Sequence, residues 1–389
     1  MKVLRVIPGL DAAFGGPSES SVNACIATQR AGVDTTVVVP MPADMAAAQP
    51  PGLSRLKTEG MQVVALPLLG FPAGQARRWG ISTAMTRWLR RNLAQFDIVH
   101  AHAAWTFPTI AVLASRADVP KILTPHETLT DFDLRRSSMP GMRLLKHLLR
   151  PHYFARYDRI VFSSELERAN SCPAAASGDR FAVIFHPVLD DRRRPPLQTS
   201  SGSGRARRML GFLGRFHPKK NLELALEALA RLPNDFTLIA AGDGTPNYTR
   251  QLKQLATDLG IAAQVHWPGF VQGQAKEDFF AQIDVLLMPS QFECFGMSVA
   301  EGLIRGVPAI VSPGVGLAPL ITEFACGDVT APSPEMIAAA ASRMLGDGQT
   351  WSRCSRQAFA AAEAKLTFAA HGEAQRRCYT AVLRQRQGK

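Results

Sequence analysis

The chain has 389 residues, of which 46% are hydrophobic and 20% are charged, and its formal net charge at pH 7 is +12. This length predicts two domains with packed cores. No apolar stretch reaches the roughly 18 residues that a membrane-spanning helix needs, and the apolar run at the N-terminus is too short for a secretory signal. The six cysteines form no C-x-x-C pair, which indicates a reduced, cytoplasmic protein without a zinc ribbon.

The positive charge favours a partner that carries phosphate, although it also serves solubility. Arginine is concentrated in clusters, among them Arg192–Arg194 and 205–208. Because no aromatic residues are interleaved with these clusters, we expect no nucleic acid partner.

In the first half of the chain, short runs rich in β-branched residues alternate with helical patterns. The predicted strands cover 2–7, 35–40, 61–68, 96–102, 121–126, 159–164 and 181–187. The predicted helices cover 18–31, 79–95 and 142–157. This alternation predicts an α/β domain with a parallel sheet and helices on both of its faces.

The segment 141–159 places four leucines on one stripe, opposite the cations Arg143, Lys146 and Arg150. The leucines are Leu144, Leu145, Leu148 and Leu149. We expect this stripe to face the core of the first domain, and the alternative is a position on an anionic membrane surface.

A stretch rich in Pro, Gly, Ser and Arg at 190–208 predicts a linker between a first domain over 1–189 and a second over 209–365. After it the alternation restarts. Strands are predicted at 209–214, 236–242, 264–270, 284–290 and 308–313, and helices at 220–232, 247–259, 273–282, 296–305 and 334–346. Parallel sheets of this kind bind ligands outside the carboxyl ends of their strands.

The stretch "GFLGRFHPKKN" at 211–221 places cations where a strand gives way to a helix. We expect Lys219 and Lys220 in the first helical turn, where the helix dipole opposes a cation by a few tenths of a kcal/mol. A bound anion shared by Lys220 and Arg215 would reverse that effect, and the alternative is a loop of solvated charges. On this argument, alanine at either position leaves the thermal stability of the free protein unchanged or raised.

Two glutamates follow the strand at 284–290. Glu293 lies in the loop and Glu301 about a turn and a half into the next helix, whose free N–H groups can bind phosphate. A phosphate would avoid the two carboxylates, so we expect them to accept hydrogen bonds from sugar hydroxyls. The alternative is a pair of surface glutamates at helical spacing.

Weaker signals lie at other predicted strand ends. Gly242 with Asp243, and Gly15 with Gly16, allow a ligand to approach the backbone closely. The spacing of His100 and His102 suits a metal, and His126 follows the next strand, but a structural histidine is the more common outcome. Asp131 and Asp133 form a D-x-D triplet, as in sites that hold a divalent metal on a nucleotide-sugar, although such a short match arises easily by chance.

Five segments in chain order resemble glycosyltransferase family 4. They are "GG" at 15–16, His126, "GRFHPKKN" at 214–221, "AGDG" at 241–244 and "PSQFECFGMSVAEGLIRGVPAI" at 289–310. The resemblance implies the GT-B fold, in which two Rossmann-like α/β domains with parallel sheets face an interdomain cleft. It also implies a C-terminal helix over 366–389 that crosses back to the N-terminal domain, which would bind the acceptor.

Family members transfer a sugar from a nucleotide-diphospho-sugar with retention of anomeric configuration and without a metal. The resemblance implies that Arg215 and Lys220 bind the diphosphate and stabilise it as it leaves. It also implies that Glu301 binds the ribose, and that Glu293 holds the donor sugar. His126 would lie near the reacting carbon. The other donor-binding residues would be Gly15, Gly16, Gly242, Asp243, Cys294, Phe295 and Gly296, and the acceptor side would comprise His102 and His126.

We therefore expect a retaining hexosyltransferase that uses no metal or other cofactor. Its acceptor would be a glycan or a lipid-linked molecule of cell-surface synthesis, reached from the cytoplasm or from the inner face of the membrane. Two segments depart from the family pattern, "FHPVLDD" at 185–191 and "PGVGLAPLI" at 313–321, which lacks the usual acid. The alternatives are a sugar phosphorylase or epimerase of the same fold, and a non-enzymatic basic protein that binds phosphate at a membrane surface.

Overall fold

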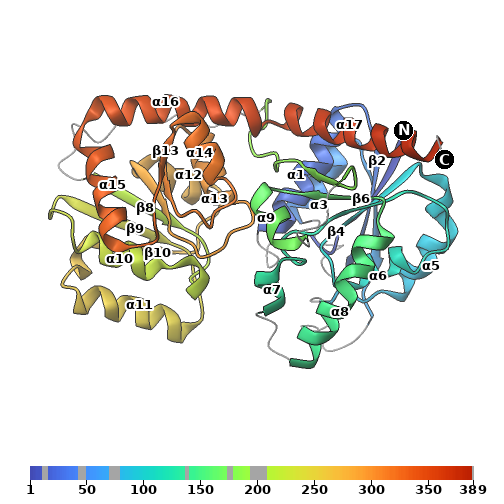
Figure 1. The fold of residues 1–389 in the computed structure, drawn as a ribbon, viewed down its shortest axis with the longest axis horizontal. Helices are drawn as coiled ribbons and strands as arrows, with labels where there is room; N and C mark the ends of the chain where they lie inside the picture. The colour runs from blue at the N-terminus through green and yellow to red at the C-terminus, as the bar shows by residue number, and fades with distance from the viewer. Residues whose placement is uncertain are drawn as a thin grey trace. The chain divides into compact units, whose positions relative to one another are not determined.

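The computed structural model divides the chain into two compact units. The N-terminal unit comprises Met1–Pro187 and Thr367–Lys389, and the C-terminal unit comprises Val188–Leu366. The residues that the structure describes are 1–10, 16–42, 50–69, 79–135, 140–172, 178–192 and 208–387. Gly15 and most of the predicted linker lie outside them. Each unit is a parallel sheet flanked by helices (Figure 1).

The N-terminal unit contains seven parallel strands in the order β3-β2-β1-β4-β5-β6-β7. They are β1 (Lys2–Val6), β2 (Asp34–Met41), β3 (Gln62–Pro67), β4 (Ile98–His102), β5 (Lys121–Thr124), β6 (Arg159–Phe162) and β7 (Phe181–Val183). All seven were predicted from the sequence. The strand order reverses between β1 and β4, which pair directly.

The helices of this unit include long and short ones. They are α1 (Gly16–Arg30), α3 (Pro51–Thr58), α5 (Thr83–Asn92) with the 3₁₀ turn η2 (Leu93–Gln95), α6 (Phe107–Leu113), α7 (Asp131–Arg135), α8 (Pro140–Arg156), α9 (Glu165–Ser171) and α17 (Phe368–Gln387). Helix α17, drawn in red, packs against α1 (Figure 1). The two helices approach so closely that a Cβ at Gly372 would lie 2.2 Å from the carbonyl oxygen of Ala27.

The C-terminal unit contains six parallel strands in the order β10-β9-β8-β11-β12-β13. They are β8 (Arg208–Leu213), β9 (Phe236–Ala241), β10 (Val265–Gly269), β11 (Val285–Met288), β12 (Ala309–Val311) and β13 (Gly327–Val329). The helices are α10 (Leu222–Leu229), α11 (Pro246–Asp258), α12 (Gln274–Gln282), α13 (Met297–Leu303), α14 (Ala318–Phe324), α15 (Pro334–Gly346) and α16 (Gly348–Lys365), with 3₁₀ turns η4 (Pro218–Lys220) and η5 (Ala262–Gln264). Here the order reverses between β8 and β11.

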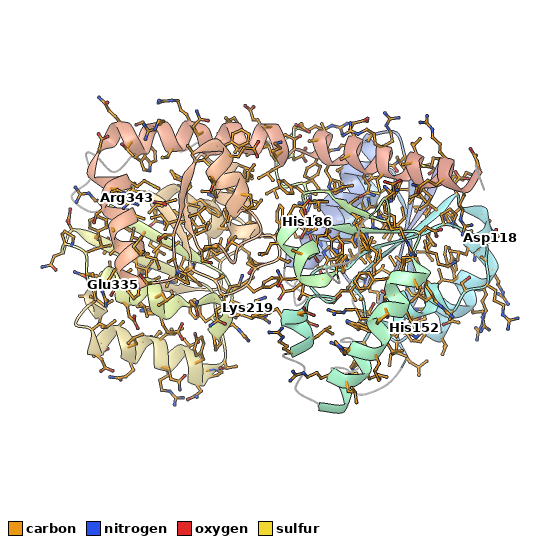
Figure 2. All side chains as sticks on the ribbon, in the orientation of Figure 1. Asp118, His152, His186, Lys219, Glu335 and Arg343 are labelled. Carbon is orange, nitrogen blue, oxygen red and sulfur yellow. The ribbon has the colours of Figure 1, made fainter. Side chains whose placement is uncertain are left out.

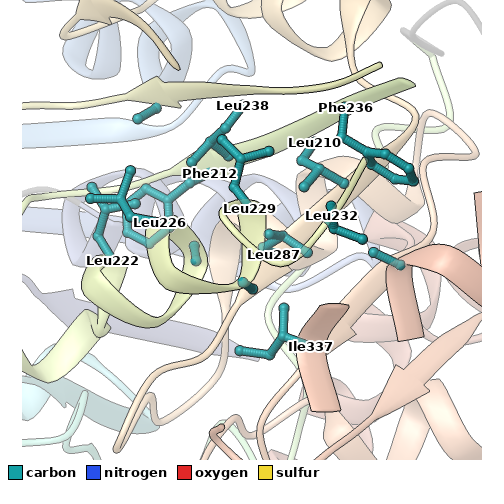
Figure 3. Close-up of a cluster of buried hydrophobic side chains, with 14 of the residues drawn as sticks. Leu210, Phe212, Leu222, Leu226, Leu229, Leu232, Phe236, Leu238, Leu287 and Ile337 are labelled. Carbon is teal, nitrogen blue, oxygen red and sulfur yellow. The ribbon is translucent and has the colours of Figure 1, made fainter. Parts of the chain in front are cut away.

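Helix α10 covers one face of this sheet with its leucine stripe (Figure 3). Leu222, Leu226 and Leu229 are fully buried and pack against strand side chains that include Leu210 and Phe212. At about 25 cal/mol per Å² of apolar surface, each such leucine contributes roughly 1.5–3 kcal/mol. This packing fixes where the chain that follows β8 must turn.

The predicted start of that helix is wrong. Lys219 and Lys220 lie in the 3₁₀ turn η4, and α10 begins only at Leu222, after Asn221 adopts a left-handed conformation with φ of 51°. The break arises because the leucine stripe begins at Leu222 and because the side chain of His217 caps the separate turn by accepting from the N–H of Lys219. The lysines therefore lie before the first turn of α10 and not within it.

The expectation that the leucine stripe of α8 faces the core is also wrong. Leu144 and Leu148 are 61% and 60% exposed, and Leu145 and Leu149 are exposed as well. The buried residue of this helix is instead Tyr153, which packs against Trp105. Among the described residues, no helix is long and apolar enough to cross a membrane.

Candidate functional site

In the C-terminal unit, the loops that follow β8 and β11 meet where the strand order reverses. The backbone N–H of Gln291 donates to the carbonyl of Lys219 over 2.8 Å. The side-chain amide of Asn221 donates to the carbonyl of Pro289 over 2.9 Å. Open α/β sheets bind ligands at this reversal point. The predicted residues Arg215, Lys220 and Glu293 all lie on these two loops.

Lys220 and Glu293 form an ion pair in the free protein. Both side chains are about 15% exposed, at 14% and 15%. Burial by itself raises the pKa of Glu293, but the charges of Lys220, Lys219 and Arg215 outweigh it and hold that pKa below its usual value. The carboxylate is therefore ionised, and the anion that Lys220 faces belongs to the protein. Arg215, in contrast, is exposed and forms no ion pair with any described residue.

The second predicted glutamate also has a cationic partner. Lys276 of α12 donates to the carboxylate of Glu301 over 2.8 Å. Next to it, Arg305 binds the carboxylate of Glu277 through two nitrogens and donates to the carbonyl of Glu301. Lys276 could not be identified from the sequence, because its contact with Glu301 joins two helices across 25 positions. These contacts hold the Glu301 carboxylate in one orientation.

The glycines at the end of β9 are required by the chain itself. Gly242 has φ of 143°, and a Cβ there would lie 1.9 Å from the carbonyl oxygen of Gly214. A Cβ at Gly244 would lie 2.4 Å from the carbonyl oxygen of Phe216. In this structure the neighbour that requires glycine at both positions is the loop after β8, and the predicted approach of a ligand stays a prediction. This contact brings Asp243 beside that loop, where its carbonyl accepts from the N–H of Phe216.

The loop that carries Glu293 is tied to the loop after β12. The N–H of Glu293 donates to the carbonyl of Gly314, and the N–H of Gly316 donates to the carbonyl of Glu293, each over 2.8 Å. Phe295 is buried, and Gly296 starts α13 with φ of 104°. The segment 313–321, which departs from the family pattern, therefore acts as a backbone support for Cys294–Gly296.

In the N-terminal unit, four histidine rings form a stacked row. His100 and His102 lie on β4, His126 follows β5, and His186 follows β7. The ring centroids of His100 and His102 are 4.6 Å apart, those of His102 and His126 are 5.2 Å apart, and those of His126 and His186 are 5.3 Å apart. All four rings are buried, and Figure 2 shows His186 within this unit. The predicted acceptor-side residues His102 and His126 are therefore neighbours, and Nδ1 of His102 lies 3.0 Å from Nε2 of His126.

His126 lies in a strained turn that a buried carboxylate holds. His126 and Glu127 have φ of 50° and 72°, a conformation that costs non-glycine residues free energy. Glu167, fully buried, accepts from the N–H of Glu127 over 2.6 Å and from both the N–H and the hydroxyl of Ser163. Sequence reasoning missed Glu167, although the S-x-x-E spacing from Ser164 marked a capping box there.

The row stays uncharged at neutral pH. Burial is the main cause that lowers the pKa of His100, His102 and His126 well below the usual value. It also lowers the pKa of His186 to about 4 and that of His371, on α17, to about 3. The row therefore offers neutral rings with one donor and one acceptor each.

The D-x-D carboxylates have cationic partners from α8. Asp131 pairs with Arg150 at 2.5 Å and Asp133 with Lys146 at 3.4 Å. Within the described ranges, no group of three or more His, Cys, Asp or Glu side chains is arranged to hold a metal. Gly16 begins α1, the helix that follows β1 in the sequence.

Two Rossmann-like parallel sheets with these strand-end loops define the GT-B class of glycosyltransferases. The structure is similar in fold to that of Anabaena HepE in complex with UDP-glucose, with a TM-score of 0.75 and 17% identity over 98% of this chain and 100% of that one. Residues 14–192 match the model of Glycosyltransferase Family 4, and residues 195–361 match that of Glycosyl transferases group 1. The chain belongs to the family 4 glycosyltransferases.

Curated relatives have somewhat higher sequence identity but match the chain only in part. The chain is 24% identical over 267 residues to an uncharacterised glycosyltransferase of Methanocaldococcus jannaschii, across 65% of this chain and 67% of that protein. It is 26% identical over 247 residues to the D-inositol 3-phosphate glycosyltransferase of Mycobacterium marinum, across 60% of this chain and 52% of that protein.

Because Lys220 pairs with Glu293, the stability expected of Lys220→Ala differs from the one predicted from the sequence. We expect Lys220→Ala to lower the free energy of unfolding of the free protein by about 1–3 kcal/mol, because it leaves a mostly buried carboxylate without its partner. Adding Glu293→Gln to Lys220→Ala should recover part of the loss. Urea denaturation measures both. Arg215→Ala, from the same loop but exposed, is the control and should leave stability unchanged. A Lys220→Ala variant with the same free energy of unfolding as the wild type would show that the pair does not stabilise the free protein.

The histidines predict how stability depends on pH. Their pKa values are lowered by folding, so below about pH 6.5 the unfolded chain binds protons that the folded protein does not. The free energy of unfolding should therefore be level above pH 6.5. Below it, stability should fall by up to about 1.4 kcal/mol per pH unit for each of the buried histidines, which are His100, His102, His126, His186 and His371.

Calorimetry between pH 7.5 and 5.5 tests this dependence. His371→Gln should flatten the slope by one histidine, whereas His152→Gln, at an exposed position on α8 (Figure 2), should leave it unchanged. A melting temperature that stays constant down to pH 5.5 would contradict the lowered pKa values of the buried histidines.

Proposed function

We propose that this protein transfers a sugar, with retention of configuration, from a nucleotide-diphospho-sugar to a glycan or lipid-linked acceptor. The observation that carries the proposal is the set of charges at the reversal point of the C-terminal sheet. Lys220, Arg215 and Lys276 lie on the same group of loops and helix starts as Glu293 and Glu301. A ligand that matches them needs both anionic oxygens and hydroxyl groups. The UDP-glucose bound by the similar structure of HepE supports this class of donor.

Arg215 and Lys220 would bind the diphosphate. Breaking the glycosyl–phosphate bond makes the diphosphate more anionic, so cations placed there stabilise the transition state more than the ground state. An ammonium group has three N–H donors. Lys220 can therefore keep Glu293 as a partner while it donates to a phosphate oxygen, and Arg215, exposed and without an ion pair in the described part of the chain, is available for the rest.

The carboxylates would bind hydroxyl groups. Glu301, oriented by Lys276, would accept from the ribose, and Glu293 would accept from the donor sugar together with contacts from the backbone of Cys294, Phe295 and Gly296. Gly242 and Asp243 would line the same edge. On the N-terminal unit, Gly15 and Gly16 would contact the donor, whereas His102 and His126 would lie on the acceptor side, with His126 near the reacting carbon.

The reaction would need no metal, because cations of the protein meet the leaving group and because Asp131 and Asp133 already pair with Arg150 and Lys146. Transfer with retention distinguishes this proposal from a non-enzymatic phosphate-binding role. A dependence of turnover on inorganic phosphate would instead favour a phosphorylase.

The test begins with a thermal-shift panel of UDP, GDP and ADP and their sugars. We expect one nucleoside diphosphate to raise the melting temperature, since a ligand stabilises through its affinity for the folded state. Lys220→Ala and Arg215→Ala should each remove most of that shift and lower kcat by about 10²-fold or more. Glu301→Gln should act mainly on donor binding.

Turnover of the matching sugar should survive EDTA, and NMR of the product should show the donor's anomeric configuration. Asp131→Asn is the matched control and should retain activity. Loss of activity on chelation that Mn²⁺ or Mg²⁺ restores would return Asp131 and Asp133 to the site, and no shift with any nucleotide would refute the proposed donor class.

We also propose that α8 lies on an anionic membrane surface, where a lipid-linked acceptor would be found. Its exposed leucines are Leu144, Leu145, Leu148 and Leu149. The helix carries no acidic residue, and its exposed cations are Arg143 and Arg156, whereas Lys146 and Arg150 pair with Asp133 and Asp131. Exposed apolar side chains beside cations on one helix suit the boundary between lipid headgroups and acyl chains.

Vesicle co-sedimentation tests this surface. The protein should bind vesicles that contain anionic lipid at low salt, and the bound fraction should fall as salt rises, because exposed charges are screened within about 10 Å at 0.1 M. Leu148→Glu should abolish binding. Ile110→Glu, at a similarly exposed apolar residue of α6, should not. Equal binding to neutral vesicles, or no binding to either kind, would contradict the proposal.

A further inference from the structure

A buried arginine lies behind the histidine row. Arg5 occupies the fourth position of β1, and its side chain is fully buried. Among the residues that the structure describes, no carboxylate forms an ion pair with it. Burying a charge without a counter-charge costs free energy, and Nε of Arg5 has no hydrogen-bond partner at all. A residue with this cost needs a reason beyond packing, because an apolar side chain would suit the centre of a strand better.

The hydrogen bonds of Arg5 lead to the row. Its NH2 group donates to the hydroxyl of Thr28 over 2.7 Å, and its NH1 group lies 3.2 Å from Nε2 of His102. A guanidinium has only donors, so Nε2 of His102 must be the acceptor and carry no proton. Neutral His102 then holds its proton on Nδ1.

The same logic applies to the next ring. Nδ1 of His102 lies 3.0 Å from Nε2 of His126, so its N–H donates and Nε2 of His126 accepts. The hydroxyl of Ser21, 3.5 Å from the same nitrogen, can only add a second donor there. Neutral His126 therefore holds its proton on Nδ1, the ring nitrogen for which no described residue provides a hydrogen-bond partner.

We infer that Arg5 is a positioning residue that orders the protons of His102 and His126, so that His126 presents an Nδ1–H donor to the substrate. Every bond in the series Arg5–His102–His126 then points in one direction, away from the guanidinium. The inference rests on the proposed function for the identity of the substrate. The group that His126 meets must be an oxygen acceptor, such as a hydroxyl of the donor sugar or of the acceptor.

This order of the protons makes His126 a hydrogen-bond donor and excludes a role as a general base. A ring whose Nε2 accepts from His102 and whose Nδ1 is protonated has no lone pair free to take a proton from the acceptor. The low pKa values of both rings agree, because burial and the charge of Arg5 keep them neutral. His126 is thus a hydrogen-bond donor and not a general base, and Arg5 fixes its tautomer through His102.

The tautomers can be read directly from the nitrogen shifts of the imidazole rings. In a long-range ¹H–¹⁵N spectrum of the full chain labelled with ¹⁵N-histidine, a protonated ring nitrogen and a bare one resonate far apart. We expect His102 and His126 both to show a protonated Nδ1 and a bare Nε2 at pH 7.5. His102→Asn and His126→Asn assign the signals. A protonated Nε2 on His126, or protons on both nitrogens, would overturn the inference.

Two further variants test whether Arg5 is the cause. Arg5→Met removes the donor, and the two rings should then lose the Nδ1–H pattern. Thr28→Val is the matched control: it removes the other acceptor of Arg5 and should leave the pattern intact. If Arg5→Met folds and keeps both tautomers, the inference fails. If it does not fold, the wild-type spectrum still decides the inference, because a protonated Nε2 on His102 or on His126 would overturn it.

The spectra need no donor or acceptor, so they separate this inference from the proposed function. A chain with the expected tautomers that transfers no sugar would refute the transferase and leave the ordered row standing. A chain that transfers sugar but has a protonated Nε2 on His126 would support the transferase and refute the inferred order of the protons.

Discussion

One constraint positions every functional side chain in this protein: all strands of a sheet run in the same direction. The loops that leave the carboxyl ends must then share one edge, and where the strand order reverses two of them lie side by side. In the C-terminal unit this brings Lys220, after β8, to Glu293, after β11, across 73 positions of sequence. In the N-terminal unit it aligns β1, β4 and β5, which supply Arg5, His102 and His126 as neighbours in one row.

Much of this could be predicted from the sequence because it depends on pattern alone. The β-branched runs gave twelve of the strands, and the leucine stripe of α10 gave its buried face. A stripe shows which residues share a face but not what covers that face, and so the leucines of α8 were assigned to the core although they are exposed. Short elements such as α9 and β13 lack enough residues for a period. Arg5 did leave a signal, a charge in the middle of an apolar strand, but its partner at His102 depends on strand order.

The two units treat buried charge differently. Lys220 and Lys276 face carboxylates, so the C-terminal unit holds its ions in place before a ligand arrives. Lys220, Glu293, Lys276 and Glu301 are thus ordered before any ligand binds, which lowers the entropy that these four side chains would lose on binding. Arg5 has only neutral acceptors. Its positive charge, which no carboxylate partner among the described residues cancels, adds to burial in lowering the pKa of His100, His102 and His126 and so in keeping these rings neutral.

Helix α17 comes from the end of the sequence but belongs to the N-terminal unit, and this affects when that unit can fold during synthesis. It supplies Tyr379, whose hydroxyl lies 2.7 Å from Nδ1 of His100, and His371, whose Nδ1 lies 2.7 Å from the carbonyl of Phe185. The first 187 residues therefore leave the ribosome without the helix that closes their core, and must wait while the whole C-terminal unit, 188–366, is translated. Domains usually fold in the order of synthesis. Here the unit that starts first is completed last, and until then the face of α1 that packs against α17 has no cover from that helix.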